Sequence, residues 1–458
     1  MKLQGYQSSA TPLSYFDGQK MGGPLALFIA LVTLGIFFEQ FDLANFGYTA
    51  PAITKSWGLS MGWVGRTNAM GSFGMLAGAL MGGWFADKAG RKIGFIASTI
   101  FYGVCTILCG LAPTPSWFMV CRFVTMMGAS ALSVTAMVFI AEMVPAEKRG
   151  KLGLRAVGIA MVAMPLAGLF AKWVVTFGPE GWRLQYYWGG AFALVEVVLV
   201  SFLCYESPRW LVSVGRGSKA KAIMERMLPG VAFDASAFAA PRRDERKGAS
   251  FLATLKAFKT MWNSFYLRRS ILLILMAIVA SNTAATISLM LPTLFKARGL
   301  SLTNSILLVS IMSWGAPAGT ILASFGLDKG GRKVPLALYG TLAAILIAVL
   351  GFAQGFTQMA YVGLALQLVN PMYYFSSQVY TTESFGTSIR STATGVIIGV
   401  GRLSTAIWML CIASLYMALG FSGFLSMTGG CIVLVMIGVL VFGHSTSKRS
   451  LEEISGEA

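Results

Sequence analysis

The sequence has little charge, a single histidine and few prolines, and each shortage excludes a class of protein. Only 12% of the 458 residues are charged, against roughly 25% in a soluble domain. So little charge cannot cover a water-facing surface of this size, which excludes a soluble enzyme. The one histidine, His444, stands near the C-terminal end, so histidine-based catalysis within an apolar core is excluded. The 15 prolines are too few for a disordered or collagen-like chain.

The signatures of an enzyme or of an ATP-driven pump are missing as well. The six cysteines lie within or at the ends of apolar runs and have no metal-ligand spacing. The sequence contains no Walker A motif, no redox-cofactor signature, and no constellation of nucleophile and base. We therefore expect no enzymatic activity, no metal, no cofactor and no nucleic-acid partner.

Apolar residues are abundant and make up 56% of the chain. They gather in twelve runs, each close to the roughly 20 residues that a helix needs to cross a bilayer. The pattern predicts an all-α polytopic membrane protein with twelve transmembrane helices. The expected spans are 24–50, 62–86, 93–112, 117–141, 150–175, 184–204, 269–294, 303–327, 334–353, 357–381, 389–417 and 421–443.

The runs divide six and six around one long polar connection. We expect an N-terminal six-helix bundle at 1–204, a cytosolic linker at 205–268, a C-terminal six-helix bundle at 269–443 and a cytosolic tail at 444–458. The net charge is +18, and Lys and Arg concentrate in the linker and in the loops on its side of the bilayer. The positive-inside rule then places both termini in the cytoplasm. We expect a monomer in the inner (plasma) membrane of a bacterium.

An internal repeat indicates that the two bundles are related. The segment Ala86-Asp-Lys-Ala-Gly-Arg-Lys92 recurs as Leu327-Asp-Lys-Gly-Gly-Arg-Lys333. Both copies follow the second span of their half. Two homologous halves with a substrate between them are typical of secondary transporters.

These motifs resemble those of the major facilitator superfamily over nearly the whole chain. The loop after span two is similar to its G-x-x-x-D-[RK]-x-G-[RK]-[RK] signature. Glu206-Ser-Pro-Arg-Trp-Leu211, together with Ser450-Leu-Glu-Glu-Ile454, resembles the sugar and organic-ion branch. Phe38-Glu-Gln-Phe-Asp-Leu43 is similar to the D-G-[YF]-D motif of aromatic acid:proton symporters, with Glu and Gln in place of Asp and Gly.

The resemblance implies two pseudo-symmetric six-helix bundles that rock around a central site, the rocker-switch form of alternating access. It implies secondary active transport, with proton-coupled uptake of a small aromatic or cyclic carboxylate as the first interpretation. A proton-coupled sugar or polyol porter is the alternative, favoured by the motif at Glu206, and a proton-driven exporter is a third. Protons would be the coupling ion, and an organic anion the partner.

Charged groups inside a bilayer are costly, from ~2.5 kcal/mol upward, so each needs a partner or a function. Asp42 and Arg122 lie at matching depths in spans one and four, and the resemblance implies the same pair. Glu39 shares a helix face with Asp42. Two close acids in apolar surroundings cannot both stay ionised at low cost, so we expect Asp42, Glu39 and Arg122 to couple transport to protons. A static buried ion pair is the alternative.

Candidate substrate-binding residues begin with Arg402, near the middle of span eleven. Small residues flank it, and a fixed guanidinium suits a carboxylate. Its alternative role is a structural partner of Glu39 or Glu196; Glu196 itself is a lone acid, either a proton relay or paired at the lipid edge. Aromatic and amide side chains at likely cavity positions complete the predicted set: Tyr48, Asn282, Trp314, Gln367, Asn370, Tyr373 and Tyr374.

A third set of charges stands in the loops predicted to be cytosolic. The superfamily resemblance implies a gate of ion pairs that breaks when the two halves rock apart. The alternative is simple anchoring of loops with positive-inside charge. The set comprises Asp87, Arg91, Glu142, Arg149, Glu206 and Arg216 in the first half, and Asp328, Arg332, Glu383 and Arg390 in the second.

Overall fold

The computed structural model describes most of the chain. The described residues are 22–144, 146–228, 231, 233, 238, 251–326, 332–386 and 389–443, with only the backbone described for 146–151, 251–254 and 324–326. Two predicted gate residues are affected: the side chain of Arg149 and the whole of Asp328 lie outside this description. The tail at 444–458 lies outside it as well.

The first half contains six membrane crossings. Five of them are formed by α1 (Gly23–Trp57), α2 (Met61–Ala89), α3 (Arg91–Gly110), α4 (Pro115–Met143) and α7 (Trp182–Leu203). The fifth crossing in chain order consists of α5 (Ala146–Ala160), α6 (Ala163–Val174) and the short helix η2 (Val175–Phe177). Three short helices of the linker follow: α8 (Pro208–Ser213), α9 (Gly217–Met227) and α10 (Phe251–Met261).

The second half repeats the plan with more interruptions. Its crossings comprise α11 (Ser264–Ala285), the π-helix η4 (Thr286–Met290) with α12 (Leu291–Ala297), α13 (Leu302–Ser313) with α14 (Gly315–Gly326), α15 (Lys333–Phe352), α16 (Phe356–Glu383) and α17 (Arg390–Phe442). Helix α17 runs for 53 residues but turns at Gly420, where φ is +66°. A positive φ is a conformation that glycine adopts without a steric penalty, so the chain reverses there and α17 makes two crossings.

The predicted twelve-helix membrane fold is confirmed. Among the described residues, ten helical stretches are long and apolar enough to cross a membrane, α17 being counted once. The two crossings of α17, together with α16, bring the described crossings to twelve. Helix α16 is less apolar than these stretches, since it carries polar side chains such as Gln367, Asn370 and Ser376. Several helices extend beyond their predicted spans; α1 continues through Pro51 to Trp57.

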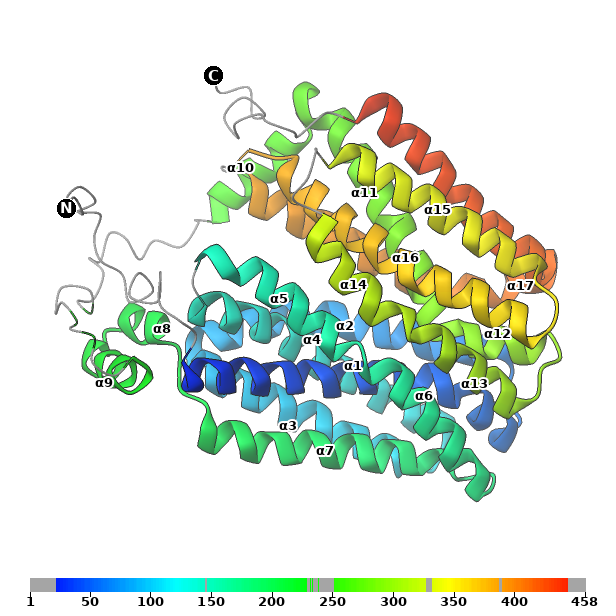
Figure 1. Cartoon of the computed structure of the whole chain (residues 1–458), viewed down its shortest axis with the longest axis horizontal. Coiled ribbons are helices and arrows are strands. Elements are labelled where there is room, and N and C mark those ends of the chain that lie inside the picture. The colour runs from blue at the N-terminus through cyan, green and yellow to red at the C-terminus, as the bar shows by residue number, and fades with distance from the viewer. Residues whose placement is uncertain are drawn as a thin grey trace.

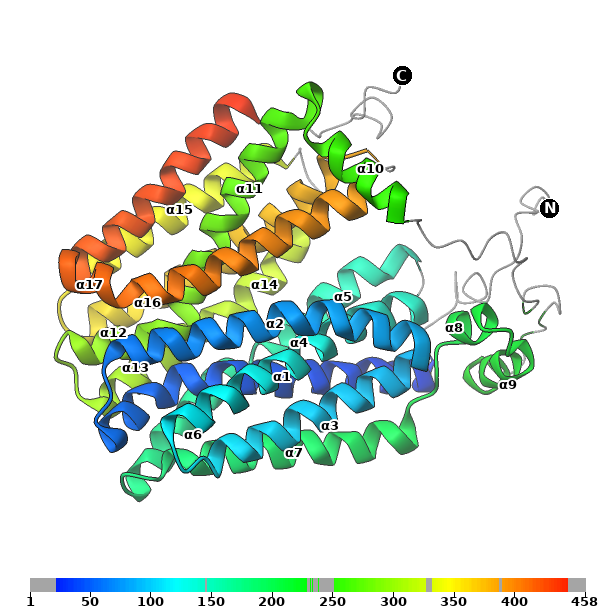
Figure 2. The ribbon, with the colours of Figure 1, turned by 180° about the vertical axis from the view of Figure 1, so that it is seen from behind.

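The two halves form two bundles that lie side by side (Figures 1 and 2). Helices α1–α7 make the first bundle, and α11–α17 make the second. They meet where α6 contacts α13, α5 contacts α14, α2 contacts α17 and α1 contacts α12. Helices α8 and α9 lie at one end of the molecule, which we call the linker end (Figures 1 and 2). Helix α1 begins at that end and finishes at the opposite end, which we call the far end.

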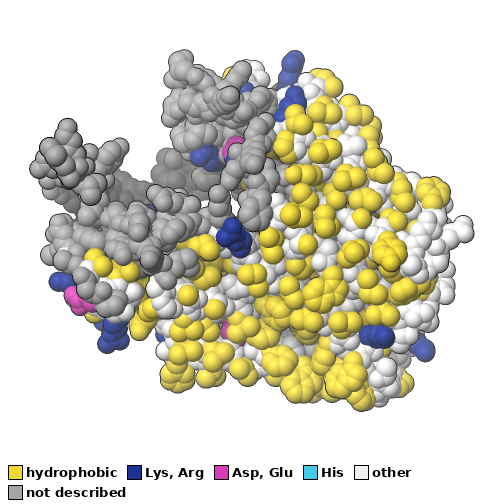
Figure 3. Space-filling view, viewed as in Figure 1, with side chains coloured by type: hydrophobic (Ala, Val, Ile, Leu, Met, Phe, Trp, Pro, Cys, Tyr) yellow, Lys and Arg dark blue, Asp and Glu magenta, His cyan; other side chains and the backbone are white. Residues whose placement is uncertain are grey.

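Apolar side chains cover much of the described part of the face seen in Figure 3. Phe202 is 84% exposed and Met417 is 77% exposed. Single exposed apolar residues are common in soluble proteins, but a surface on which they are contiguous marks an interaction with another apolar phase. The described outer surface therefore fits a protein whose sides face lipid.

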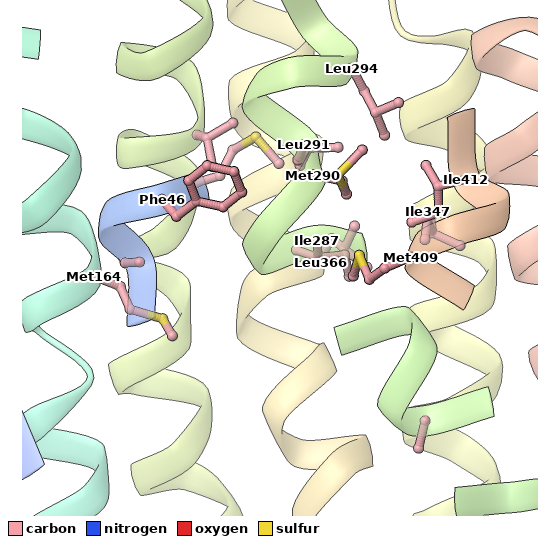
Figure 4. Packing of buried hydrophobic residues seen from close by; sticks show 14 of the residues in the cluster. Phe46, Met164, Ile287, Met290, Leu291, Leu294, Ile347, Leu366, Met409 and Ile412 are labelled. Atoms are coloured by element: carbon pink, nitrogen blue, oxygen red, sulfur yellow. The ribbon is translucent and has the colours of Figure 1, made fainter. Parts of the chain in front are cut away.

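A buried apolar cluster contains residues of both bundles (Figure 4). Phe46 of α1 belongs to it with Met290 and Leu291 from the η4–α12 segment and Met409 of α17. Glycine permits the closest approach: a Cβ on Gly65 of α2 would collide with the backbone oxygen of Met409. Close backbone packing through small residues is how membrane helices associate.

Candidate functional site

A buried ion pair lies in the middle of the first bundle. Asp42 is fully buried on α1 and Arg122 is 3% exposed on α4. Arg122 Nη1 donates to Asp42 Oδ2 at 2.9 Å, and Nη2 donates to the backbone oxygen of Asp42 at 3.2 Å. The Thr106 hydroxyl of α3 donates to Asp42 Oδ1 at 2.9 Å. Both buried charges therefore have a partner, as low-dielectric surroundings demand.

A second layer of amides supports this pair. Asn45, one turn after Asp42, donates to Asp42 Oδ1 at 3.4 Å. Gln185 of α7 donates to Asn45 Oδ1 at 2.8 Å and to the backbone oxygen of Ala167 at 3.0 Å. Thr106, Asn45 and Gln185 were missed by sequence analysis. Their signal was available, because each is a polar residue within an apolar span.

Glu39 lies one turn before Asp42 on α1 and is 2% exposed. Gln40 Nε2 donates to Glu39 Oε2 at 2.9 Å. The carboxyl attracts the guanidinium of Arg402 electrostatically. Among the described residues Glu39 has no direct ion pair, so its charge is less fully compensated than that of Asp42.

A cavity of about 180 Å³ lies between the two bundles. Arg402 is the one charged side chain among the described residues that line it, and Tyr374 adds an aromatic face. The remaining lining residues are small, apolar or hydroxylic: Leu43, Ser72, Met75, Ser281, Ala284, Ala285, Ser288, Leu289 and Thr405. Ser288 and Leu289 belong to the π-helix η4, and π-helical turns frequently mark functional sites.

The other predicted binding residues lie in different places. Asn282 is adjacent to the cavity, where its Oδ1 accepts hydrogen bonds from Ser404 at 3.2 Å and Thr405 at 3.3 Å. The Tyr48 hydroxyl contacts the Ser313 hydroxyl across the two bundles at 2.9 Å. Trp314 is 45% exposed and does not line the cavity.

Helix α16 buries three more of the predicted binding residues. Gln367, Asn370 and Tyr373 are at most 5% exposed, and none of them lines the cavity. Asn370 Oδ1 and the Tyr373 hydroxyl have no hydrogen-bond partner among the described residues. The structure thus brings together Arg402 and Tyr374 on the cavity wall and Asn282 beside it. The binding role of all eight predicted residues stays a prediction.

A compact charge network occupies the linker end of the first bundle. Arg91 pairs with Asp87 at 2.5 Å and with Glu142 at 2.9 Å. Glu206 Oε1 accepts backbone N–H groups of Arg91 at 2.8 Å and Ser207 at 2.9 Å. Ser207 in turn donates from its hydroxyl to Glu142 Oε2 at 2.7 Å. The predicted gate residues Asp87, Arg91, Glu142 and Glu206 are therefore joined within one bundle.

The second bundle has a smaller counterpart at the same end. Arg332 Nε lies 3.0 Å from Glu383 Oε2, and Arg390 Nε donates to the backbone oxygen of Phe385 at 3.2 Å. Arg216 is exposed at the start of α9 and forms no ion pair in the described part of the chain. No described ion pair at this end connects the two bundles.

Twelve crossings in two bundles, with a charged cavity between them, define a membrane transporter of the major facilitator superfamily. A family model described as sugar (and other) transporter matches residues 31–457. The chain belongs to this family, and it is an integral membrane transporter rather than an enzyme.

Named relatives agree with this assignment. The inner membrane metabolite transport protein YdjE of Escherichia coli is 26% identical over 89% of this chain and 89% of its own length. The 4-hydroxybenzoate transporter PcaK of Acinetobacter baylyi is 25% identical over 86% of this chain and 87% of its own. The xylose transporter XylE from E. coli, in an inward-open conformation, shares the fold with a TM-score of 0.73 at 19% identity, covering 93% of this chain and 98% of that one.

Proposed function

We propose that this protein imports a small organic carboxylate together with a proton. The observation that carries the proposal is Arg402, a lone guanidinium on the wall of the cavity between the bundles. A guanidinium offers two parallel N–H donors that match the two oxygens of a carboxylate. Cavity walls that are otherwise apolar and hydroxylic leave the charge of Arg402 available to a ligand.

An aromatic or cyclic carboxylate is the preferred substrate class. Tyr374 lines the same cavity as Arg402, and aromatic rings pack favourably in offset or edge-to-face arrangements. The relative named as a 4-hydroxybenzoate transporter supports this class. A sugar or polyol is the second candidate, favoured by the hydroxyl groups of Ser72, Ser281, Ser288 and Thr405 around the cavity.

Coupling to protons would follow because Glu39 and the substrate carboxylate compete for the same cation, Arg402. Arg402 attracts the carboxyl of Glu39 when that carboxyl is ionised. A proton on Glu39 removes this competing negative charge, so a substrate carboxylate then has Arg402 to itself. Asp42 differs because Arg122 already neutralises it at 2.9 Å. In this mechanism Glu39 responds to the substrate, whereas protonation of Asp42 releases Arg122 and permits helix rearrangement.

Alternating access would use the two ends of the interface differently. Hydrogen bonds between the bundles, such as Tyr48 to Ser313 and Lys296 Nζ to the Pro51 oxygen at 2.7 Å, lie in its middle and toward the far end. The ion pairs described at the linker end, Arg91 with Asp87 and Glu142 and Arg332 with Glu383, each lie within one bundle. With the linker in the cytoplasm of a bacterium and its inner membrane around the bundles, this arrangement corresponds to a state that is closed to the outside.

Two measurements on purified protein test the proposal. Thermal-shift screening against carboxylates, sugars and amines at pH 5.5 and 7.5 should show stabilisation by carboxylates; stabilisation by sugars alone would favour the second candidate. Uptake of the best ligand is then measured in vesicles with and without an imposed pH difference. Accumulation should require the acidic side to be outside, and uptake that ignores the pH difference would refute proton coupling.

A further inference from the structure

Glu196 of α7 is a buried acid that the mechanism above does not use. Its side chain is fully buried in the first bundle. Neither Oε1 nor Oε2 has a hydrogen-bond partner among the described residues. A native protein leaves few buried polar atoms unsatisfied, and each one calls for an explanation.

The surroundings of Glu196 come from helices α1, α3 and α7. Gly35 of α1 lies directly against Glu196 Oε1 and Phe95, so that a Cβ at this position would collide with both. Tyr102 of α3 is also fully buried, and its hydroxyl likewise has no described partner. Tyr102 stands one turn before Thr106, which donates to Asp42, and the neighbouring Gly103 packs against Ala193, about one turn before Glu196 on α7.

Charged and titratable groups near Glu196 are few. They are Tyr102 on α3 and Cys204 at the end of α7, with Lys92 close to Cys204, and Glu39 and Asp42 close to Tyr102. Lys92 Nζ donates to the backbone oxygen of Ser201 at 2.7 Å and is thereby held near the end of α7. No described cation pairs with Glu196.

An ionised carboxylate without a cation or a hydrogen-bond donor is very costly in an apolar interior, whereas the protonated carboxyl is neutral. We propose that Glu196 is a second proton-binding site, which exchanges its proton with the Glu39–Asp42 site through the hydroxyl of Tyr102. Side-chain rotation that brings the Tyr102 hydroxyl within hydrogen-bond distance lets the tyrosine oxygen accept the proton of one carboxyl while its own hydroxyl proton passes to the other, so Tyr102 is neutral before and after the transfer.

The position of Glu196 gives this relay a direction. Gly35, which contacts Glu196, precedes Asp42 by seven residues of α1, or roughly 10 Å along the helix axis toward the linker end. On α7, Glu196 stands about two turns from the end at Leu203. The relay therefore leads from the Glu39–Asp42 site toward the linker end. This directional role rests on the proposed proton coupling, whereas the protonated state of Glu196 does not.

Infrared spectroscopy tests the protonated state independently of transport. At pH 7.5 the infrared spectrum of the wild-type protein should contain the carbonyl-stretching band of a protonated carboxyl group. E196Q should lose that band. The control is E225Q, which removes a glutamate exposed on α9 and paired with Lys221 and should leave the band unchanged. A band of full intensity in E196Q would overturn the assignment, and so would its absence from the wild type.

Transport tests the relay. We expect E196Q to keep substrate exchange, which needs no net proton movement. The accumulation that a pH difference drives should fall at least tenfold in E196Q. Y102F should also lower the pH-driven accumulation. If E196Q does not fold, E196L replaces it in the same measurement. Accumulation at the wild-type level in E196Q would overturn the relay. A wild-type protein without pH-driven accumulation would instead refute the proposed function.

Discussion

Removing the guanidinium of Arg402 is the most direct test of substrate recognition. A hydrogen bond to a charged group contributes about 1.5–3 kcal/mol. Since 1.4 kcal/mol is a tenfold change in binding, Arg402→Ala should weaken binding of a carboxylate by about 10- to 150-fold. Arg402→Lys keeps the charge but loses the paired donors, so it should lie between the alanine variant and the wild type.

The assay compares a carboxylate with its neutral carboxamide. Both ligands are titrated in a thermal-shift or equilibrium-binding experiment with wild type, Arg402→Ala and Arg402→Lys. The alanine substitution should weaken binding of the carboxylate and leave binding of the amide nearly unchanged, because the amide carries no charge. Arg66→Ala is the matched control, since Arg66 is an exposed arginine of α2 that does not line the cavity.

Two outcomes would refute this reasoning. Equal loss of affinity for the carboxylate and the amide would show that Arg402 supports the shape of the cavity rather than the charge of the ligand. An unchanged carboxylate affinity would remove Arg402 from the site altogether. In the second case the cavity would lose its one described charge, and the sugar or polyol alternative would become the better explanation.

Three further predictions address the ion pair, the linker end and the far end. Asp42→Asn should abolish pH-driven accumulation and keep exchange; uphill uptake at the wild-type level would reject its proton role. Arg332→Gln should change the free energy of unfolding by no more than ~1 kcal/mol, because the pair of Arg332 with Glu383 is partly exposed. The same substitution should nevertheless slow transport turnover, and an unchanged turnover would leave loop anchoring as the role of Arg332. Gly65→Ala should push against the Met409 backbone and destabilise this contact between the bundles by ~1–3 kcal/mol. Labelling of a cysteine introduced beside the contact should then increase, and unchanged labelling would contradict this.

The membrane fold could be predicted from the sequence because apolar run length carries most of the information. A bilayer accepts only helices or closed barrels as spanning structures, so twelve runs of suitable length leave little choice. The helix ends were less predictable. Helix α1 passes Pro51 and continues to Trp57, and the break between α13 and α14 falls at Trp314 within one expected span. Such details depend on packing against the other bundle.

Which face of a helix meets the cavity was also beyond the sequence. Asp42 and Arg122 could be matched in depth, and the structure places them in contact. Trp314 and Tyr373 have the residue types expected of a binding site, yet neither lines the cavity. Residue type indicates what a side chain can bind, whereas its orientation is set by helix rotation. Thr106 and Gln185 show the converse. The sequence marks them as polar residues within apolar spans, but only the structure shows that they contact Asp42 and Asn45.

The distribution of acids constrains how any coupling must work. In the second half of the sequence, from 269 to 443, the only acids are Asp328 and Glu383, and Glu383 lies at the linker end with Arg332. The buried acids Glu39, Asp42 and Glu196 all belong to the first bundle, while Arg402 belongs to the second. A proton bound by the first bundle can therefore affect a carboxylate bound by the second only across the interface. In the proposed rocker-switch mechanism, rocking the bundles would change the distance between Glu39 and Arg402, so the motion that alters access would also alter the coupling energy.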